Sequence, residues 1–259
     1  MKEFFLTQTS VKDLENEQTC PWRWKEQWLE GNIPFKSNEL MDRGKYFEQL
    51  ILGSGAISGD EVNDLPRLKN GEKSAEHQRI DAQAARAKAM LFDPKDPEYL
   101  GFTVVRTQLE IKKGNKKGTY DIEATDEEKY PWVLDLKLTG DLTSDRTKYS
   151  WGNNWQDLDL VQMTHYQDLY HEEFGVLPKM GLLVFDYSTQ KRVMFGEIVI
   201  SDEKRAEKNI RFKAAEETID LYNKHGWVKI PNIKECESCP LQCDLRIYGS
   251  KIIKKVINY

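Results

Sequence analysis

The chain has 259 residues, and its 39% hydrophobic and 31% charged residues are typical of a globular protein with a heavily solvated surface. No apolar run approaches the roughly 20 residues of a membrane-spanning helix, and the N-terminus turns polar too soon for a signal peptide, so we expect a cytoplasmic protein with no membrane partner. The net charge of −5 does not itself indicate a nucleic-acid-binding protein, although a local basic groove decides phosphate affinity more than the total charge does.

The first part of the chain carries helix signals. A capped start at Thr9-Ser10 opens a helical region over residues 8–30. Apolar periodicity and end signals then predict helices over 39–52 and 75–92. The intervening segment 53–73 is rich in Gly, Asp, Asn and Pro, which favours a loop.

The centre of the chain carries strand signals. Alternating apolar residues predict strands over 102–112, 119–124 and 132–138, followed by a long helix over 155–174. Two further strands, over 180–186 and 193–200, and an amphipathic helix over 202–225 complete the pattern. This order of elements implies an α/β sandwich with a mixed sheet.

Three lysine- and arginine-rich segments are candidates for a phosphate-binding groove. Each could equally be an ordinary solvated surface. They lie at 112–117, 204–213 and 251–255.

The central strands also carry two acidic residues and a lysine. Asp121 lies on one predicted strand, and Asp135 and Lys137 lie on the next. Side chains two residues apart on a strand share a face, so Asp135 and Lys137 point the same way. One or two carboxylates suffice to hold Mg²⁺, and a nearby ammonium can orient or deprotonate an attacking water. The pattern predicts a cation-and-water site suited to phosphodiester cleavage, with a surface pair at a strand end as the alternative.

Two details favour the functional interpretation. Gly118, three residues before Asp121, allows a close approach of another part of the chain to the backbone. Asp135 follows the apolar run Trp132-Val133-Leu134, where a buried acid needs a reason. Both details make an ordinary surface pair less favoured as the explanation of the acidic residues.

These motifs resemble the PD-(D/E)XK nuclease superfamily, and specifically its RecB-like branch. The matching residues are Gly118-Thr-Tyr-Asp121 and Asp135-Leu-Lys137-Leu-Thr-Gly140. The branch continues into a helix with the pattern Gln-x-x-x-Tyr, which here is Gln162 to Tyr166. The resemblance implies that Gln162 orders the lysine or the water and that Tyr166 contacts the phosphate. On the residues alone, a helix face that packs a tyrosine on the sheet is the alternative.

Upstream of these strands, the RecB-like branch has a helix with the pattern Gly-x-x-x-His, whose histidine binds the metal. The match here is Gly44-Lys-Tyr-Phe-Glu48, so Glu48 replaces the histidine. A carboxylate oxygen suits Mg²⁺ or Mn²⁺ even better than imidazole does. The resemblance implies that Glu48, Asp121 and Asp135 are the metal ligands. It assigns catalysis to Asp121, Asp135, Lys137, Gln162 and Tyr166.

The four cysteines form a second candidate site. They are Cys20, Cys236, Cys239 and Cys243. In an intracellular protein, a C-x2-C-x3-C group indicates a metal or redox site, and a tetrahedral centre would need Cys20 as its fourth ligand. Some RecB-like members, such as CRISPR-associated adaptation nucleases and helicase-nuclease subunits, hold a [4Fe-4S] cluster with one cysteine before the core and three after it. The spacing before the last cysteine is shorter here, so Zn²⁺ and unligated thiols stay open.

The resemblance implies a restriction-endonuclease-like core, in which a mixed central sheet is flanked by helices. N-terminal helices would precede this core, and a C-terminal Cys-rich segment would close the metal cluster. We expect a single nuclease domain over 1–259, with a cysteine region formed by 8–30 and 230–245, an insertion over 53–100, and a catalytic core over 102–225.

The implied activity is that of a Mg²⁺- or Mn²⁺-dependent DNA nuclease. The family favours exonuclease action on DNA ends or single strands in recombination, repair or replication, often beside a helicase or recombination protein. One alternative is a non-catalytic DNA-binding or assembly module that keeps the fold. The other is a structure-specific endonuclease with the same chemistry.

Overall fold

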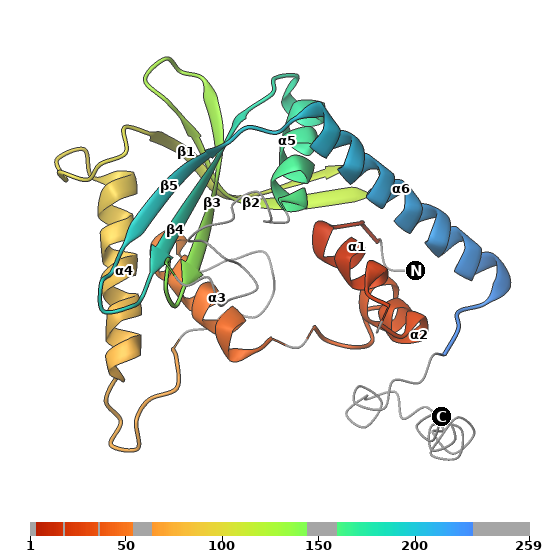
Figure 1. Ribbon diagram of the computed structural model, residues 1–259, viewed down its shortest axis with the longest axis horizontal. Helices are drawn as coiled ribbons and strands as arrows, with labels where there is room; N and C mark the ends of the chain where they lie inside the picture. Colours follow the sequence, from red (N-terminus) through yellow and green to blue (C-terminus); the bar gives the residue numbers. More distant parts are fainter. Residues whose placement is uncertain (1–3, 18, 36, 54–63, 144–159, 230–259) are drawn as a thin grey trace. The chain divides into compact units, whose positions relative to one another are not determined.

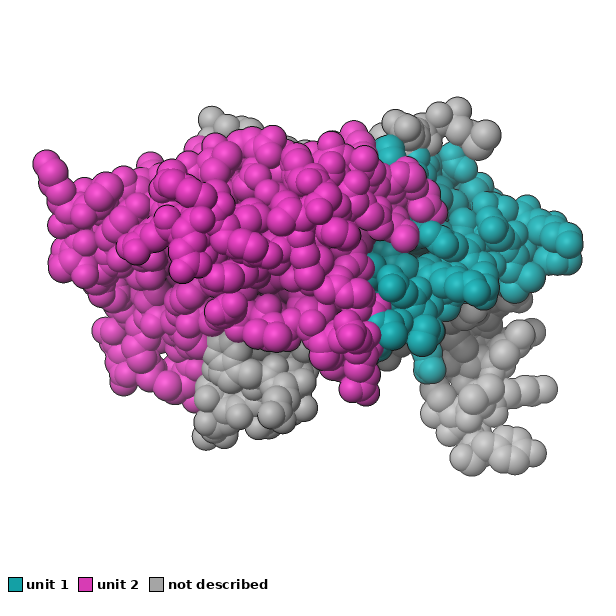
Figure 2. Space-filling view, turned by 90° about the horizontal axis from the view of Figure 1, so that it is seen from above, with its two compact units in different colours: residues 1–36, 206–259 teal, residues 37–205 magenta. Residues whose placement is uncertain are grey.

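The computed structural model describes residues 4–17, 19–35, 37–53, 64–143 and 160–229. The chain forms two compact units, which are coloured separately in Figure 2. Unit 1 comprises residues 1–36 and 206–259, and unit 2 comprises residues 37–205. None of the described helices is long and apolar enough to cross a lipid bilayer. The expected division into cysteine region, insertion and catalytic core stays a prediction.

Unit 2 is built on a five-stranded sheet with the order β1-β2-β3-β4-β5 (Figure 1). All neighbouring strands are antiparallel except β3 and β4, which are parallel and are joined through α5. The sheet is therefore mixed, as the sequence predicts. The strands are β1 (Thr103–Lys113), β2 (Lys116–Thr125), β3 (Pro131–Thr139), β4 (Lys179–Asp186) and β5 (Val193–Ile198).

Three helices of unit 2 flank the sheet: α3 (Glu39–Leu52), α4 (Ala75–Phe92) and α5 (Val161–Phe174). The first two begin and end where the sequence predicts. Asn38 caps α3 by accepting from Met41 N at 3.0 Å, and Ser74 caps α4 in the same way. The helix predicted from residue 155 is described from Val161, and residues 155–159 lie outside the described part of the chain.

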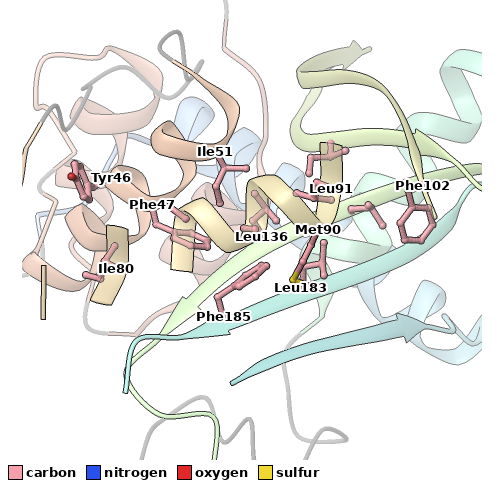
Figure 3. Close-up of a cluster of buried hydrophobic side chains, with 14 of the residues drawn as sticks. Tyr46, Phe47, Ile51, Ile80, Met90, Leu91, Phe102, Leu136, Leu183 and Phe185 are labelled. Atoms are coloured by element: carbon pink, nitrogen blue, oxygen red, sulfur yellow. The ribbon is translucent and has the colours of Figure 1, made fainter. Parts of the chain in front are cut away.

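Each face of the sheet has its own hydrophobic core. One core joins α3 and α4 to β2, β3 and β4, and Figure 3 shows Phe47 of α3 against Phe185 of β4, with ring centroids 5.3 Å apart. The other core joins α5 to β1, β2 and β3 through residues such as Tyr120 and Leu169. The mixed α/β fold with a central sheet flanked by helices agrees with the expected restriction-endonuclease-like core.

Unit 1 contains α1 (Gln8–Glu15), α2 (Pro21–Trp24), the π-helical turn η1 (Lys25–Leu29) and most of α6 (Asp202–His225). The capped start predicted at Thr9-Ser10 is wrong by two to three residues. Thr7 is the N-cap, and it exchanges hydrogen bonds with Ser10 in a capping box, at 3.1 Å and 2.9 Å. Ser10 is therefore the third residue of the helix and not its cap.

Candidate active site

Asp121 of β2 meets Asp135 and Lys137 of β3 in the middle of the sheet. The side chain of Asp135 is buried, and its residue is 2% exposed. Lys137 Nζ forms an ion pair with Asp135 Oδ2. Asp121 Oδ2 accepts a hydrogen bond from the backbone nitrogen of Leu136 at 2.7 Å. Leu136 is the residue between Asp135 and Lys137 in the sequence. The structure thus brings together the two carboxylates and the lysine that the sequence singled out.

A break in the regular strand pattern places Asp121 there. Tyr120 packs in the core beneath α5, whereas Ile122, two residues later, packs in the core beneath α3 and α4. Residues two apart on a regular strand share a face, so the alternation switches at Asp121. The residue that faces Asp121 on β1 is Gln108, whose φ is +53°. Left-handed backbone at a residue other than glycine costs free energy, and such strained positions are over-represented at functional sites.

Glu48 of α3 lies in the same electrostatic field. It is half-buried, and burial raises its pKa to about 7, with Asp135 adding to the rise and Lys137 opposing it. Burial also raises the pKa of Asp121 well above its usual range, and the charges of Glu48 and Asp135 raise it further. Each of these carboxyl groups therefore responds to the other acids of the site.

Lys137 stays charged in this environment. Burial alone would lower its pKa, but the carboxylates of Asp135, Asp121 and Glu48 outweigh that effect and raise the pKa. One ammonium group then faces three acidic groups. Such an excess of acid is the condition in which a hard divalent cation binds well.

The donor atoms fit a divalent cation. Asp135 Oδ2 is fully buried and, apart from the ion pair with Lys137, has no hydrogen-bond donor among the described residues. Within the same residues, no group of three His, Cys, Asp or Glu side chains is gathered into a complete ligand set. Mg²⁺ keeps several of its waters and needs only one or two carboxylates, so Asp121 and Asp135 meet this requirement. The ligand role of Glu48 stays a prediction.

The α5 helix brings Gln162 and Tyr166 to the site. Gln162 Nε2 donates to Tyr166 Oη at 2.8 Å. Burial raises the pKa of Tyr166, and the charges of Asp135 and Asp121 raise it further. A Cβ atom on Gly118 would lie 2.9 Å from Leu169 Cδ1 and 3.0 Å from Tyr166 Cδ1. This contact confirms the close approach predicted at Gly118, because only glycine lets α5 lie so near β2.

The model of one protein family, described as the PD-(D/E)XK nuclease superfamily, matches residues 8–243. The chain belongs to this superfamily. Membership implies a nuclease, that is, a phosphodiester hydrolase, and nucleases of this superfamily typically use divalent metal ions such as Mg²⁺ or Mn²⁺. The superfamily's name describes the acidic residue and the Asp/Glu-x-Lys motif that Asp121, Asp135 and Lys137 match.

One solved structure supports the fold of this PD-(D/E)XK nuclease. A protein from Eubacterium rectale, named as a candidate exonuclease, is similar with a TM-score of 0.60 and 16% identity, over 92% of this chain and 87% of that chain. The protein SSO0001 is 15% identical over 77% of this chain and 84% of that chain, but its TM-score of 0.29 is too low to indicate a shared fold. No curated protein is similar enough to count as a relative.

The expected basic groove of the nuclease is largely neutralised where the structure describes it. Glu110 forms ion pairs with Lys112 at 2.9 Å and with Lys117 at 3.3 Å. Arg211 of α6 likewise pairs with Glu15 at 2.6 Å. The tail segment 251–255 lies outside the described residues. These pairs favour the ordinary solvated surface for the described part of the first two segments.

Cys20 lies beside the chain that leads to the other cysteines. Its Sγ atom is 4.0 Å from Val228 O, and Trp22 N donates to the same oxygen at 3.0 Å. Trp24 stacks on Trp227 with ring centroids 5.6 Å apart. Cys236, Cys239 and Cys243 themselves lie outside the described residues. Unit 1 thus joins the N-terminal cysteine to a point just before the C-terminal group.

Sequence reasoning missed two charged residues near the end of β3. Asp186, the last residue of β4, is completely buried, and Arg192 contacts it across the β4–β5 turn. A strand-end aspartate and a turn arginine are common in any sequence. The buried position of Asp186 depends on the parallel pairing of β4 with β3, which no local pattern reveals.

Proposed function

We propose that this PD-(D/E)XK nuclease is a Mg²⁺- or Mn²⁺-dependent deoxyribonuclease of the RecB-like branch. The observation that carries the proposal is the meeting of Asp121, Asp135 and Lys137, with a buried Asp135 oxygen that has no donor other than the lysine in the described part of the chain. The proposed substrate is DNA with free ends or single strands. A helicase or recombination protein as partner belongs to the same proposal and rests on the resemblance alone.

Each residue of the candidate active site has its own proposed role in cleavage. Asp121 and Asp135, with Glu48, would hold the cation, which when bound stabilises charge on the phosphate and lowers the pKa of water. Lys137 is charged, so its first role is to donate hydrogen bonds to the attacking water or to the phosphate as negative charge develops. Tyr166, held by Gln162, would position the phosphate.

Exonuclease action is preferred to endonuclease action because of the name of the Eubacterium rectale protein and the RecB-like motifs. The likeness to that protein is one of fold, since the two chains share 16% identity. The direction of digestion along a strand is not part of the proposal.

One assay tests the proposal. Labelled linear, circular and single-stranded DNA are incubated with the protein in Mg²⁺, Mn²⁺ or EDTA. We expect cleavage of linear or single-stranded DNA that needs metal and is lost in Lys137→Ala and Asp121→Ala. Lys179→Ala is the matched control, because Lys179 is also a strand lysine paired with an aspartate, Asp126, at 3.3 Å, but is not assigned to the site.

Other results of the DNA assay would contradict the proposal or favour one of the alternative functions. If the Lys137 and Asp121 variants cleave as well as the wild type, the nuclease seen is a contaminant. DNA binding without cleavage would favour the non-catalytic assembly module. Cleavage of the circular substrate would favour the endonuclease.

For the cysteines, we propose a [4Fe-4S] cluster bound by Cys20, Cys236, Cys239 and Cys243, with Zn²⁺ as the alternative. The position of Cys20 beside Val228 supports the proposal, because Val228 precedes Cys236 by only eight residues. Anaerobically purified protein should show an absorbance shoulder at about 400 nm if it holds iron and sulfide, and none if it holds Zn²⁺.

A further inference from the structure

The catalytic half of β3 is paired with a neighbouring strand on one side. The β2–β3 pairs run from Pro131 to Leu134, whereas β4 pairs with β3 as far as Thr139. On the β2 side of Asp135–Lys137, the backbone hydrogen bond that the described residues show is the one from Leu136 N to the Asp121 side chain. The position of Lys137 therefore depends on how the far end of β3 is held.

Asp186 holds that end from the adjacent strand. It faces Thr139 in the β3–β4 register, and the residue is completely buried. Five donor atoms surround its carboxylate: Leu142 N at 3.3 Å, Ser188 N at 3.1 Å, Ser188 Oγ at 2.6 Å, Arg192 N at 3.3 Å and Arg192 Nε at 3.2 Å. A buried carboxylate with its oxygens satisfied in this way fixes the groups that donate to it.

Arg192 carries the connection further along the chain that leaves β3. Its Nη2 atom donates to Asp141 Oδ1 and to Thr143 Oγ1, both at 3.0 Å. Tyr187 N, next to Asp186, donates to Thr139 O at 3.0 Å. Residues of the β4–β5 turn and the end of β4 thus contact the backbone or side chains of residues 139–143. This segment begins two residues after the lysine proposed for catalysis, Lys137.

The turn is itself fixed to α4. Gln83 Nε2 donates to Arg192 O at 3.2 Å and also to Asp186 O. Arg79 Nε donates to Tyr187 O at 2.6 Å. These bonds tie the turn to a helix of 18 residues that packs in the core, so the turn is a firm base for the end of β3.

We propose that Asp186 and Arg192 are positioning residues for cleavage, which hold residues 139–143 and thereby keep Lys137 directed at the reacting phosphate. Neither residue is assigned a metal or substrate contact. The inference rests on the proposed nuclease activity. A displacement of a reacting group by about 1 Å can lower a rate by about 100-fold, so a modest loosening of β3 is enough to be measured.

The test compares Arg192 of the turn with Arg86 of α4, an arginine that contacts the same turn. Arg192 and Arg86 have side chains 33% and 32% exposed, and both are paired with carboxylates. Arg86 Nη1 donates to Lys191 O at 2.6 Å but is not bonded to residues 139–143. Steady-state cleavage of end-labelled linear DNA is measured for the wild type, Arg192→Ala, Arg192→Lys and Arg86→Ala.

We expect Arg192→Ala to lower kcat by about tenfold or more while KM for DNA stays within about twofold. Arg192→Lys keeps one of the bonds and recovers part of kcat. Arg86→Ala keeps the wild-type kcat. If Arg192→Ala cleaves like the wild type, or if both alanine variants lose the same activity, the inference is wrong. The proposed function would survive either result, because it is tested by cleavage in the wild type and its loss in the Lys137 and Asp121 variants.

Amide hydrogen exchange gives a readout that does not depend on catalysis. In the full-length protein, Arg192→Ala should speed exchange in residues 139–143 and reach Lys137, whereas Arg86→Ala should leave that segment unchanged. Unchanged exchange in Arg192→Ala would contradict the inference even if its kcat fell. Asp186→Asn serves as a second variant, provided that its thermal midpoint shows a folded protein, and it should change both readouts in the same direction.

Discussion

At the scale of single residues, the candidate site holds more acidic groups than basic ones: three carboxyl groups face the single ammonium group of Lys137. Asp135 has Lys137 as its partner, but burial raises the pKa of Glu48 and of Asp121, the charge of Asp135 raises both further, and Glu48 also raises that of Asp121. A protein that holds several acids near one lysine is strained unless protons or a cation neutralise them. The site should therefore respond to pH when metal is absent and respond less when metal is bound.

Glu48 gives the first prediction. Its pKa in the folded protein is about 7, above the roughly 4.3 of an unfolded glutamate, so the folded state binds the proton more tightly. The resulting stability is fully present below about pH 4.3 and is lost as the pH rises through 7. In EDTA, Glu48→Gln should match the wild type at about pH 4 and exceed its free energy of unfolding by about 1–2 kcal/mol at about pH 8.

Urea unfolding at several pH values measures this difference. Acids far from the site contribute equally to both proteins, so the gap between the two curves reports Glu48 together with its effect on Asp121. Adding Mn²⁺ at pH 8 should stabilise the wild type more than Glu48→Gln if Glu48 is a ligand. Parallel curves for the two proteins in EDTA would mean that Glu48 does not titrate in this way.

Tyr166 gives the second prediction. Tyr166→Phe keeps the ring that packs against Gly118 and Tyr120 and removes only the hydroxyl bonded to Gln162. We expect cleavage to fall by about 10- to 100-fold with little change in thermal midpoint. The control is Tyr170→Phe, one turn along α5, whose hydroxyl instead donates to Glu123 at 2.8 Å. That variant should lose about 1 kcal/mol of stability and keep its activity. The opposite pattern would place the functional hydroxyl at Tyr170.

At the scale of elements, the contact between α5 and β2 decides where Gln162 and Tyr166 lie. Gly118→Ala would place a methyl group 2.9 Å from Leu169 Cδ1 and 3.0 Å from the Tyr166 ring, so α5 must shift outward. We expect a loss of about 1–3 kcal/mol in the free energy of unfolding and a lower cleavage rate. Chemical denaturation and the DNA assay measure the two effects.

Gly44 is the matched control for that prediction. It lies inside α3, and a Cβ there would meet no atom within 4 Å. Gly44→Ala should therefore stabilise the protein by about 0.5–1 kcal/mol. If Gly118→Ala proves equally harmless, the packing of α5 on β2 is looser than the contact distances indicate.

The elements themselves could largely be predicted from the sequence, because their signals are local. Asn38 and Ser74 cap α3 and α4 within three residues of the backbone groups they bind. Asp121, Asp135 and Lys137 could be found because strand alternation and family motifs are also short-range. The left-handed backbone at Gln108 and the buried carboxylate of Asp186 could not, because each follows from pairing between strands distant in the sequence.

At the scale of the whole chain, the two candidate sites belong to different units. The residues proposed for cleavage, from Glu48 to Tyr166, all lie in unit 2. Cys20 and the chain that leads to the C-terminal cysteines lie in unit 1. This division favours a structural role for the proposed cysteine centre, since the chemistry proposed for DNA cleavage uses none of its residues.

The division gives the last prediction. Cys20→Ser removes one proposed ligand, so the variant should lose iron or zinc and unfold at a lower temperature. A metal that ties Cys20 to Cys236 closes a long loop and lowers the entropy of the unfolded chain, which stabilises the folded state. Lys137→Ala should lose cleavage and keep its full content of that metal. Metal per chain, thermal midpoint and cleavage rate are measured on both variants. Wild-type metal content in Cys20→Ser would remove Cys20 from the centre, and loss of the metal in Lys137→Ala would show that the two sites depend on each other.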